Sequence, residues 1–414
     1  MKLLIIGVSG FIGSHIYQAL SHHGHRLIGC SRYQVSGINW RACDFNQSAQ
    51  DWERETEGID IVINAAGIFH QTANQTFLHV HDVGPKRLFD VCRQKNIRVL
   101  QISAIGVEQE KPVTEFLRSK RFADQYLLES DQANIVLYPG IVIGEQGATT
   151  RQLAMFSRLW VIPMLFNRND KLPLISIYQL CETVVELVNN WPTSKQSIVL
   201  LGKDESMQGL MNGLRQWMGK GEGHYVYLPL KSTKWFFKLF PKVSFGSFTK
   251  ESVDMLSAYS EKQYIPITDE SAVDSLRKYK PTDTFLKGLN FQLLFYINLI
   301  LLGLIWIMSG LVSMINLEQS RELVGLVGID SDLGDVFIFG GAVMDIALGV
   351  LMWFSRFRRW VIYLQIIVMV VYSIIISIFL PVYWLHPFAP VIKNFAVLMM
   401  ALYILTEEKG KKYV

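Results

Sequence analysis

Three glycines near the start of the chain have the spacing of a phosphate-binding loop. Gly7, Gly10 and Gly13 follow directly on the apolar run Leu3–Ile6 and precede an amphipathic stretch. Glycines let the backbone approach a pyrophosphate, and the N-terminus of the next helix offers free N–H donors to its oxygens. The sequence therefore predicts a dinucleotide site at this strand-to-helix junction, formed by Gly7, Ser9, Gly10, Phe11, Ile12 and Gly13.

The end of the second expected strand, Arg26–Cys30, bears on which dinucleotide binds. NAD sites usually place an acidic residue here for the ribose 2′-hydroxyl. This chain has Ser31 and Arg32, which could donate a hydrogen bond and a positive charge to a 2′-phosphate. NADP is therefore the favoured cofactor, with NAD as the alternative. Other expected contacts are Asp44 and Phe45 at the adenine, and Asn64, Ala65, Ala66 and Gly67 near the nicotinamide ribose.

These residues lie in a chain whose strands and helices alternate. The expected strands are 3–6, 26–30, 60–64, 98–102, 135–138, 172–177 and 197–201, and the expected helices are 11–22, 80–95, 115–129, 178–190 and 207–217. Such alternation predicts an α/β, Rossmann-type doubly wound parallel sheet, with ligands beyond the carboxyl ends of the strands. We expect a nucleotide-binding domain over 1–285, divided into a core at 1–150 and a small substrate-side lobe at 151–285.

Residues 286–414 differ sharply in composition from the rest. Apolar stretches near 293–315, 336–354, 360–380 and 387–405 approach the roughly 20 residues that span a bilayer. They predict an all-α four-helix transmembrane bundle, joined to the first domain by a linker at 278–287.

Charge in the expected loops predicts the orientation of this bundle. Basic residues precede the first span, separate the second from the third and follow the fourth, whereas 317–335, expected to be a loop, is mostly acidic. Because basic loops stay in the cytoplasm, both termini and the nucleotide-binding domain should be cytoplasmic.

One acidic residue, Asp345, falls in the middle of the second expected span. A carboxyl there should face the bundle interior and find a partner, for which Lys393 and Asn394 are the candidates. Asp345 is then part of a structural ion pair, or a protonated carboxyl that locks the bundle, or part of a polar pocket for a quinone, a lipid or a proton.

Charge and cysteine usage exclude other classes. The net charge is only +4, and no basic stripe with interleaved aromatic residues suggests a nucleic-acid partner. The cysteines, Cys30, Cys43, Cys92 and Cys181, are isolated in sequence and lack zinc-ligand spacing. We therefore expect unpaired thiols in a reducing compartment and no metal site.

The motifs of the first domain resemble those of the extended and atypical short-chain dehydrogenase/reductases, which are NAD-dependent epimerase/dehydratase-like. The resemblance rests on the glycine loop, Asp44-Phe45, Asn64–Gly67 and Pro139-Gly140 with Ile143-Gly144. The runs Ile102–Gly106 and Phe116–Lys120 are most similar to an atypical branch that contains a complex I-associated subunit.

The tail resembles the DoxX-like membrane family, through Trp306, Ser309–Leu311, Asp345 with Gly349, and His386-Pro387 with Lys393-Asn394. Fusions of these two families occur in bacteria, so the resemblance implies a multi-pass protein of the bacterial cytoplasmic membrane.

The resemblance also implies where chemistry should occur, and one residue is missing there. Active relatives use the tyrosine of a YxxxK motif as acid and base, its lysine to hold the nicotinamide ribose, and a serine on the substrate. Here Ser103 and Lys120 are present, but Phe116 occupies the tyrosine position. Tyr138, which precedes the cofactor-binding Pro139, could replace the phenol. His81 stands in place of a family asparagine, and His70 could be a base or a surface residue.

Two functions remain open on this evidence. The chain is either an oxidoreductase that acts on a lipid-like or quinone substrate at the membrane, or a catalytically weak cofactor-binding module that stabilises or senses a membrane redox complex.

Overall fold

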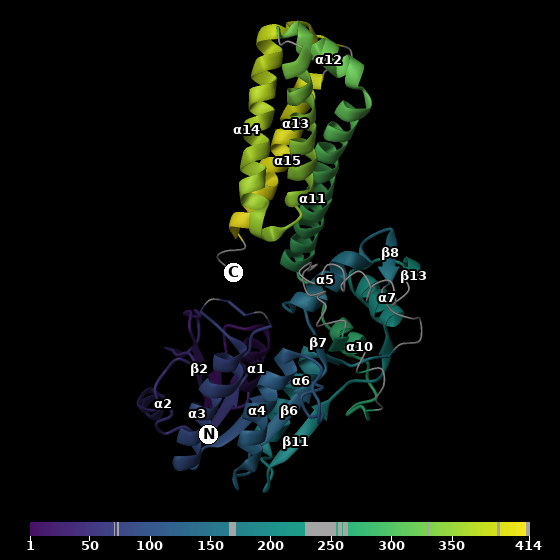
Figure 1. Cartoon of the computed structure of the whole chain (residues 1–414). Coiled ribbons are helices and arrows are strands. Elements are labelled where there is room, and N and C mark those ends of the chain that lie inside the picture. The colour runs from purple at the N-terminus through teal and green to yellow at the C-terminus, as the bar shows by residue number, and fades with distance from the viewer. Residues whose placement is uncertain are drawn as a thin grey trace. The chain divides into compact units, whose positions relative to one another are not determined.

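The apolar runs of the first 200 residues form one parallel sheet in the computed structural model. Its seven strands have the order β11-β6-β5-β4-β1-β2-β3, and every neighbouring pair is parallel. The strands are β1 (Lys2–Ile6), β2 (Arg26–Ser31), β3 (Trp40–Ala42), β4 (Ile61–Asn64), β5 (Arg98–Ile102), β6 (Ile135–Pro139) and β11 (Gln196–Leu200). The predicted fold class is therefore confirmed for this part of the chain (Figure 1).

The structure describes residues 1–227 apart from 70, 73 and 165–170, residues 254–255 and 259, and residues 264–410 apart from 329–330 and 387–389. It divides into two compact units, Met1–Leu286 and Lys287–Val414.

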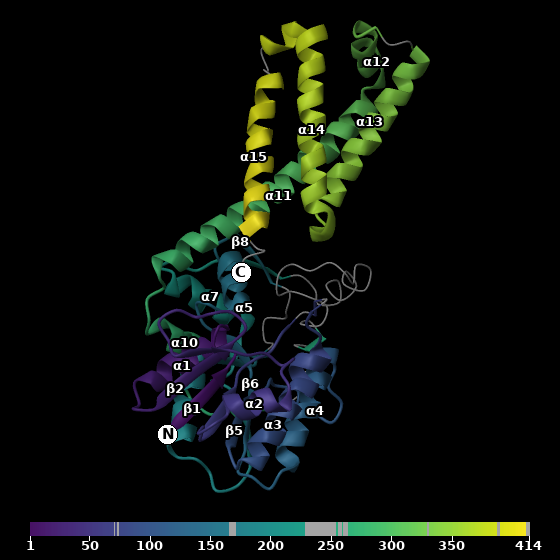
Figure 2. The same ribbon diagram turned by 90° about the vertical axis from the view of Figure 1, so that its left-hand side faces the viewer.

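Helices cover both faces of the sheet because successive strand residues point to opposite sides. Leu3 and Ile5 of β1 pack with α1 (Phe11–Ser21) and α6 (Ile177–Asn189), whereas Leu4 and Ile6 face the other layer. That second layer consists of α2 (Ala49–Glu55), α3 (Gly84–Gln94) and α4 (Glu115–Glu129), with a π-helical turn, Leu78–Val83, leading into α3. Figure 2 shows α1 and α4 on opposite sides of the strands. Such a doubly covered sheet leaves its carboxyl edge open for a ligand.

A smaller lobe follows the core. It contains α5 (Ala148–Ser157), α7 (Met207–Trp217), α10 (Ala272–Arg277) and the short strands β7 (Ile141–Ile143), β8 (Val161–Met164), β9 (Lys171–Leu172), β10 (Leu174–Ser176), β12 (Glu205–Ser206) and β13 (His224–Tyr227). The strand expected at 172–177 is divided into β9 and β10 by Pro173, which lacks an N–H for a ladder and accepts from Ile141 N through its carbonyl, at 2.6 Å.

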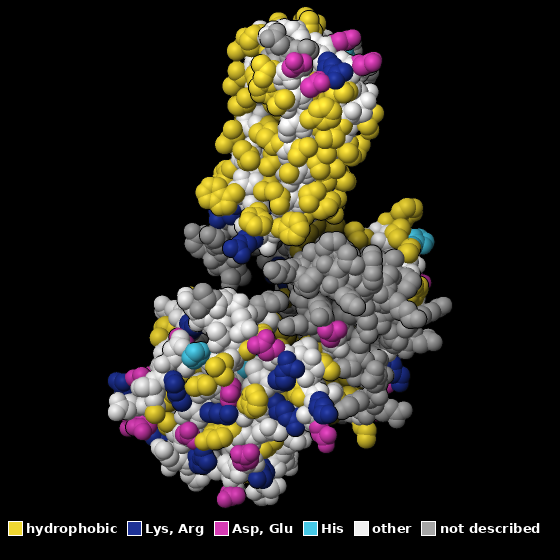
Figure 3. Space-filling model, in the orientation of Figure 1, with side chains coloured by type: hydrophobic (Ala, Val, Ile, Leu, Met, Phe, Trp, Pro, Cys, Tyr) yellow, Lys and Arg dark blue, Asp and Glu magenta, His cyan; other side chains and the backbone are white. Residues whose placement is uncertain are grey.

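The second unit is helical. It contains α11 (Asp283–Ile315, which starts in the first unit), α12 (Leu317–Leu326), α13 (Ser331–Leu351), α14 (Ser355–Phe379), a 3-10 turn (Pro381–Trp384) and α15 (Pro390–Gly410). Of the described helices, α11, α13 and α14 are long and apolar enough to cross a membrane. The fourth expected span forms α15, which packs on α14. Figure 3 shows hydrophobic side chains along the sides of this unit.

Two segments expected to be irregular contain helices. The proposed linker at 278–287 is wrong from Asp283 onward, because the side chain of Thr282 accepts from Phe285 N at 3.2 Å and starts α11. The acidic segment 317–335 contains α12, whose Arg321 forms two 2.6 Å hydrogen bonds with Asp335 at the start of α13.

Candidate functional site

The glycine loop packs so tightly against the end of β4 that larger side chains cannot replace two of its glycines. Gly7 has a φ of +83°, and a Cβ there would lie 2.8 Å from Ala66 N. A Cβ on Gly13 would lie 2.3 Å from the carbonyl oxygen of Gly7. Gly10 is the N-cap of α1 and supplies no side-chain cap. The N–H groups at this helix end are thus available to a phosphate, as the predicted site requires.

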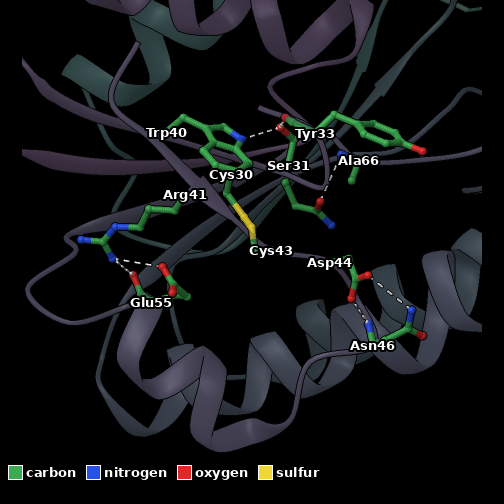
Figure 4. The surroundings of a disulfide bond; sticks show 11 residues. Cys30, Ser31, Tyr33, Trp40, Arg41, Cys43, Asp44, Asn46, Glu55 and Ala66 are labelled. Carbon is green, nitrogen blue, oxygen red and sulfur yellow. Dashed lines mark hydrogen bonds and ion pairs between the residues drawn. A yellow bond between two sulfur atoms is a disulfide. The ribbon is translucent and has the colours of Figure 1, made fainter. Parts of the chain in front are cut away.

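The end of β2 presents one exposed side chain, Arg32, and one hydrogen-bonded side chain, Ser31, which Figure 4 shows beside Tyr33 and Trp40. Ser31 is buried; its hydroxyl donates to Tyr33 O at 2.8 Å and accepts from Trp40 Nε1 at 2.9 Å. The serine hydrogen predicted for a 2′-phosphate is therefore used within this loop. Arg32 is exposed, with its guanidinium carbon 5.4 Å from the Tyr33 ring centroid. Of this pair, only Arg32 presents a free charge to a ligand here.

The residues beyond β3 are also held by local contacts. Asp44 accepts from Asn46 N at 2.8 Å, and Phe45 is buried and packs against Trp52 with ring centroids 6.0 Å apart. The Asp44 carboxylate thus fixes a turn at the adenine edge of the expected site.

Two cysteines at this edge correct a prediction. Cys30 is the last residue but one of β2 and Cys43 follows β3, and the two form a disulfide with their Cα atoms 5.7 Å apart. The expectation of unpaired thiols is therefore wrong for this pair, although Cys92 and Cys181 are free and buried. The pairing comes from adjacent parallel strands, which their separation in sequence does not reveal.

At the other end of the expected site, the side chain of Lys120 lies beside the turn that follows β4. Its Nζ donates to Ile102 O at 3.2 Å, and a Cβ on Gly67 would lie 3.5 Å from the same nitrogen. The turn itself is held by Asn64, which donates to Gln101 Oε1 at 2.7 Å and accepts from Ala66 N at 3.2 Å. Burial lowers the pKa of Lys120, an effect that Asp124 opposes. The structure thus brings Gly67 and Lys120 together.

His81 adjoins Lys120 in a single tautomer. Its Nε2 accepts from Ile68 N at 3.0 Å, so its Nδ1 carries the hydrogen and donates to Ser119 Oγ, 2.9 Å away. Ser119 in turn donates to Phe116 O at 2.7 Å. Burial, together with the charge of Lys120, lowers the pKa of His81 to about 2. His81 is therefore a neutral connector between the β4 turn and α4.

Ser103 lies at the end of β5, but its hydroxyl donates to the carboxylate of Asp124. Sequence reasoning missed Asp124, which is one helical turn after Lys120 and 1% exposed. Burial raises the pKa of Asp124 to about 6, against the lowering effects of Ser103 and Lys120. The signal that the sequence offered was an acidic residue four positions after Lys120, because residues with this spacing share one face of a helix.

The missing phenol is replaced by packed hydrocarbon. Phe116 is buried, stacks on Phe69 and meets the rings of Phe77 and His81 edge-on, with centroids 6.0 Å and 5.4 Å away. Its ring centroid is 5.9 Å from Lys120 Nζ. The side chain that should transfer a proton therefore has none to give.

The other candidate proton donors are no better placed. Tyr138 is buried in the same core cluster as Phe116, and burial raises its pKa further above the ordinary range, with contributions from Asp124 and Glu108. The neighbouring Pro139 accepts from Ile105 N at 2.9 Å. His70 lies outside the described residues.

The polar residues of the helical unit are paired differently from prediction. Asp345 is buried, as expected, but its partner is Ser309 of α11, whose hydroxyl donates to Oδ2 at 2.9 Å. Asn394 donates to Ser373 Oγ at 3.0 Å, and Lys393 is exposed. The predicted pairing of Asp345 with Lys393 or Asn394 is therefore wrong. Lys393 lies in the first turn of α15, where a long side chain can reach the headgroups instead.

The parallel sheet and its glycine loop form a Rossmann-type fold, which is the fold of dinucleotide-binding domains. Residues 3–165 match the NAD dependent epimerase/dehydratase family, and residues 303–402 match the DoxX-like family. The chain thus consists of an epimerase/dehydratase domain followed by a C-terminal DoxX-like domain.

Individual proteins are similar at lower identity. Ceramide reductase of Caulobacter vibrioides is 23% identical over 182 residues, which cover 42% of this chain and 56% of that protein. The match therefore spans about half the length of this relative.

Two solved structures have the same fold. The ADP-L-glycero-D-manno-heptose-6-epimerase of Helicobacter pylori gives a TM-score of 0.51 at 16% identity, covering 70% of this chain and 96% of that one. A nucleoside-diphosphate-sugar epimerase of Staphylococcus aureus gives 0.50 at 15% identity, covering 70% and 99%.

Proposed function

We propose that this chain is a membrane-anchored, NADP(H)-dependent oxidoreductase that acts on a lipid-like or quinone substrate. The observation that carries the proposal is the approach of Lys120 to Gly67 at the carboxyl edge of a sheet whose glycine loop leads into an uncapped helix, in a chain that also has helices long and apolar enough to span a membrane. The similarity to a ceramide reductase supports a membrane lipid as the substrate class.

The residues present fit a dinucleotide. Because Gly7 and Gly13 have no Cβ, the loop can pack closely against neighbouring backbone atoms. The uncapped end of α1 can then receive a pyrophosphate. Lys120 would hold the nicotinamide ribose, and Arg32 would bind a 2′-phosphate, which favours NADP over NAD. When bound, the reduced cofactor supplies a hydride.

Reduction of a carbonyl also needs a proton, and here the site departs from active relatives. Phe116 offers none, His81 is neutral with its hydrogen engaged by Ser119, and the Ser103 hydrogen is engaged by Asp124. These contacts support the second candidate, a cofactor-binding module with weak catalysis that stabilises or senses a membrane redox complex. Tyr138 is the remaining phenol on a neighbouring strand, and a substrate would have to reach it.

We place the protein in the bacterial cytoplasmic membrane with both termini and the epimerase/dehydratase domain in the cytoplasm. Support comes from the basic residues at the start of α14, Arg356, Arg358 and Arg359, and from the acidic residues around α12. Labelling of single cysteines introduced in 317–326 tests this, because reaction with an impermeant reagent only in inverted vesicles would contradict the orientation.

Turnover in lipid nanodiscs would separate the two functions. NADPH oxidation is followed with a long-chain lipid ketone, a short-chain ketone and a quinone, and products are identified by mass. An oxidoreductase consumes NADPH with one of the lipid-like substrates, and Lys120→Ala abolishes this while Lys95→Ala, at an exposed position, does not. Tight NADPH binding without turnover would establish the cofactor-binding module, and absence of binding would refute both.

A further inference from the structure

The small sheet formed by β8 and β13 has one face that its own unit covers and one that it does not. Ile162 and Met164 of β8 are buried, whereas the residues on the other face, Val161 and Val226, are 44% and 49% exposed. Trp160, just before β8, is 82% exposed and meets the ring of His224 edge-on at 6.0 Å. We call Trp160, Val161, His224 and Val226 the β8–β13 patch. Figure 3 shows hydrophobic side chains gathered over these two strands.

The composition of the patch matches the membrane interface better than bulk water. Clustered exposed apolar side chains mark interaction sites in soluble domains. A tryptophan ring is amphipathic and settles at headgroup level, where its N–H can be hydrated while its carbons leave water. Within the described residues, the Trp160 N–H has no hydrogen bond, so it is available to a lipid headgroup.

Contacts within the first unit connect the patch to the start of a membrane helix. Tyr225 of β13 donates to Asn212 of α7, and Tyr227 donates to Gln208 Oε1 at 2.6 Å. At the other end of α7, Trp217 donates to Tyr279 O at 2.7 Å and packs on Phe285 of α11, with ring centroids 5.1 Å apart. The same short helix therefore supports the patch and the first turn of α11.

The stretches of α7 and α11 that make these contacts are short. Asn212 and Trp217 are about 8 Å apart along α7, given a rise of 1.5 Å per residue. The apolar part of α11 begins at Phe291, about 9 Å along that helix from Phe285. The first unit thus contains the start of an apolar helix, so a bilayer is an apolar partner that the same chain meets.

The charge of the adjoining sequence points to anionic lipid. The sequence-based expectation of no basic stripe with interleaved aromatic residues overlooked the stretch after Tyr227, where lysines at 231, 234, 238 and 242 are interleaved with Trp235, Phe236, Phe237 and Phe240. Basic residues mixed with aromatic ones are typical of segments that bind headgroups. These residues lie outside the described part of the chain, and the patch is defined without them.

We propose that the β8–β13 patch docks onto the surface of the bilayer, with Trp160 at the depth of the headgroups. The inference goes beyond the proposed function, because it involves neither cofactor nor turnover.

Site-specific fluorescence on the full chain in nanodiscs tests the proposal. Trp160→Cys and Val226→Cys are each labelled with an environment-sensitive dye, and Phe122→Cys, at an exposed aromatic position of α4, is the matched control. Cys92 and Cys181 are buried and Cys30 is paired with Cys43, so the introduced thiol is the reactive one. The nanodiscs contain phosphatidylcholine, with or without phosphatidylglycerol and a lipid carrying a quencher near its headgroup.

At positions 160 and 226 we expect a blue-shifted emission and at least twofold quenching by the labelled lipid, increased by phosphatidylglycerol, with little change at position 122. Emission at 160 and 226 equal to that at 122 would overturn the proposal. Quenching that depends on protein concentration rather than on labelled lipid would overturn it in favour of a second copy of the chain. The Val226 variant decides the matter if the Trp160 variant fails to fold.

Discussion

The ring of Phe116 lies over the ring of Phe69, with centroids 4.9 Å apart and planes inclined by 17°. Phe116 is 4% exposed and Phe69 is 72% exposed, so the outer ring screens the inner one from water. At the position where the resemblance implies a proton-donating phenol, the chain has an aromatic stack. Any activity must therefore obtain its proton elsewhere or be slow.

Restoring the phenol tests this directly. Phe116→Tyr should raise turnover of a reducible substrate by about 10²–10⁴-fold, the usual contribution of general acid catalysis. Phe116→Leu keeps the site apolar and should leave the low rate unchanged. NADPH oxidation in nanodiscs measures both. Brisk activity in the unmodified chain that also survives Phe116→Leu would show that another residue, such as Tyr138, transfers the proton.

The cofactor preference is tested at Arg32. Arg32→Glu should weaken NADPH binding by about 1–3 kcal/mol, because a charge-assisted contact is lost and a repulsion is gained. NADH binding should change much less, since NADH has no 2′-phosphate. Isothermal calorimetry measures both affinities. Tighter binding of NADH than NADPH by the unmodified chain would refute the assignment of NADP.

The close packing of the glycine loop predicts that two alanine substitutions differ sharply in their effect on dinucleotide binding. Gly13→Ala should abolish dinucleotide binding and lower the thermal midpoint, because the new Cβ would lie 2.3 Å from a backbone oxygen. Gly221→Ala is the control, since a Cβ there meets nothing within 4 Å. Calorimetry and thermal unfolding provide the two readouts. Normal binding by the Gly13 variant would mean that the loop moves more freely than this packing allows.

The raised pKa of Asp124 predicts a pH dependence of stability. Its pKa of about 6 in the folded protein exceeds the ordinary value of 3.8, so the folded state binds the proton more tightly. The associated stabilisation is complete below pH 3.8 and is lost as the pH rises through 6. Asp124→Asn is neutral throughout and retains an acceptor for Ser103.

The thermal midpoint of the D124N variant should therefore rise relative to that of the unmodified chain between about pH 4 and pH 7, and then level off. Asp131→Asn, at an exposed position, controls for general charge effects. A difference between D124N and the unmodified chain that stays constant with pH would show that Asp124 does not titrate in this range.

The disulfide between Cys30 and Cys43 should contribute measurably to stability. Closing a loop with a sequence separation of 13 typically stabilises by about 3 kcal/mol, which corresponds to roughly 5–10 °C in the thermal midpoint. Dithiothreitol should lower the midpoint of the unmodified chain by this amount and leave Cys43→Ser unaffected. Alkylation of all four cysteines in unfolded, unreduced protein would contradict the pairing.

The fold was largely predictable because strands buried on both faces read as continuous apolar runs. The expected bounds of β5 and α4 agree with the structure, Arg98–Ile102 and Glu115–Glu129. The approach of Lys120 to Gly67 also follows from topology, because the turn after β4 and the helix α4, which comes after β5, both begin at the carboxyl ends of neighbouring parallel strands.

Pairings between side chains were not predictable in the same way. The bonds of Ser103 to Asp124, of His81 to Ser119 and of Asp345 to Ser309 join residues far apart in sequence. These bonds depend on how far each helix is rotated about its own axis. Hydrophobic periodicity predicts which face of a helix is buried, but it does not predict that rotation closely enough to identify side-chain partners. The helix start at Thr282 was missed for a different reason, because a proline followed by a capping residue also fits a linker.

The contact between Ser309 and Asp345 has a consequence for how the protein enters the membrane. Insertion of α13 alone would expose the Asp345 carboxyl to hydrocarbon, at a cost of about 2.5–3.5 kcal/mol on insertion scales. α11 is synthesised first and carries both Ser309 and Gly310, where a Cβ would lie 2.4 Å from Ala342 O. The two helices therefore pack closely at Gly310 and give one carboxyl oxygen of Asp345 a partner, so they should leave the translocation channel as a pair rather than one after the other.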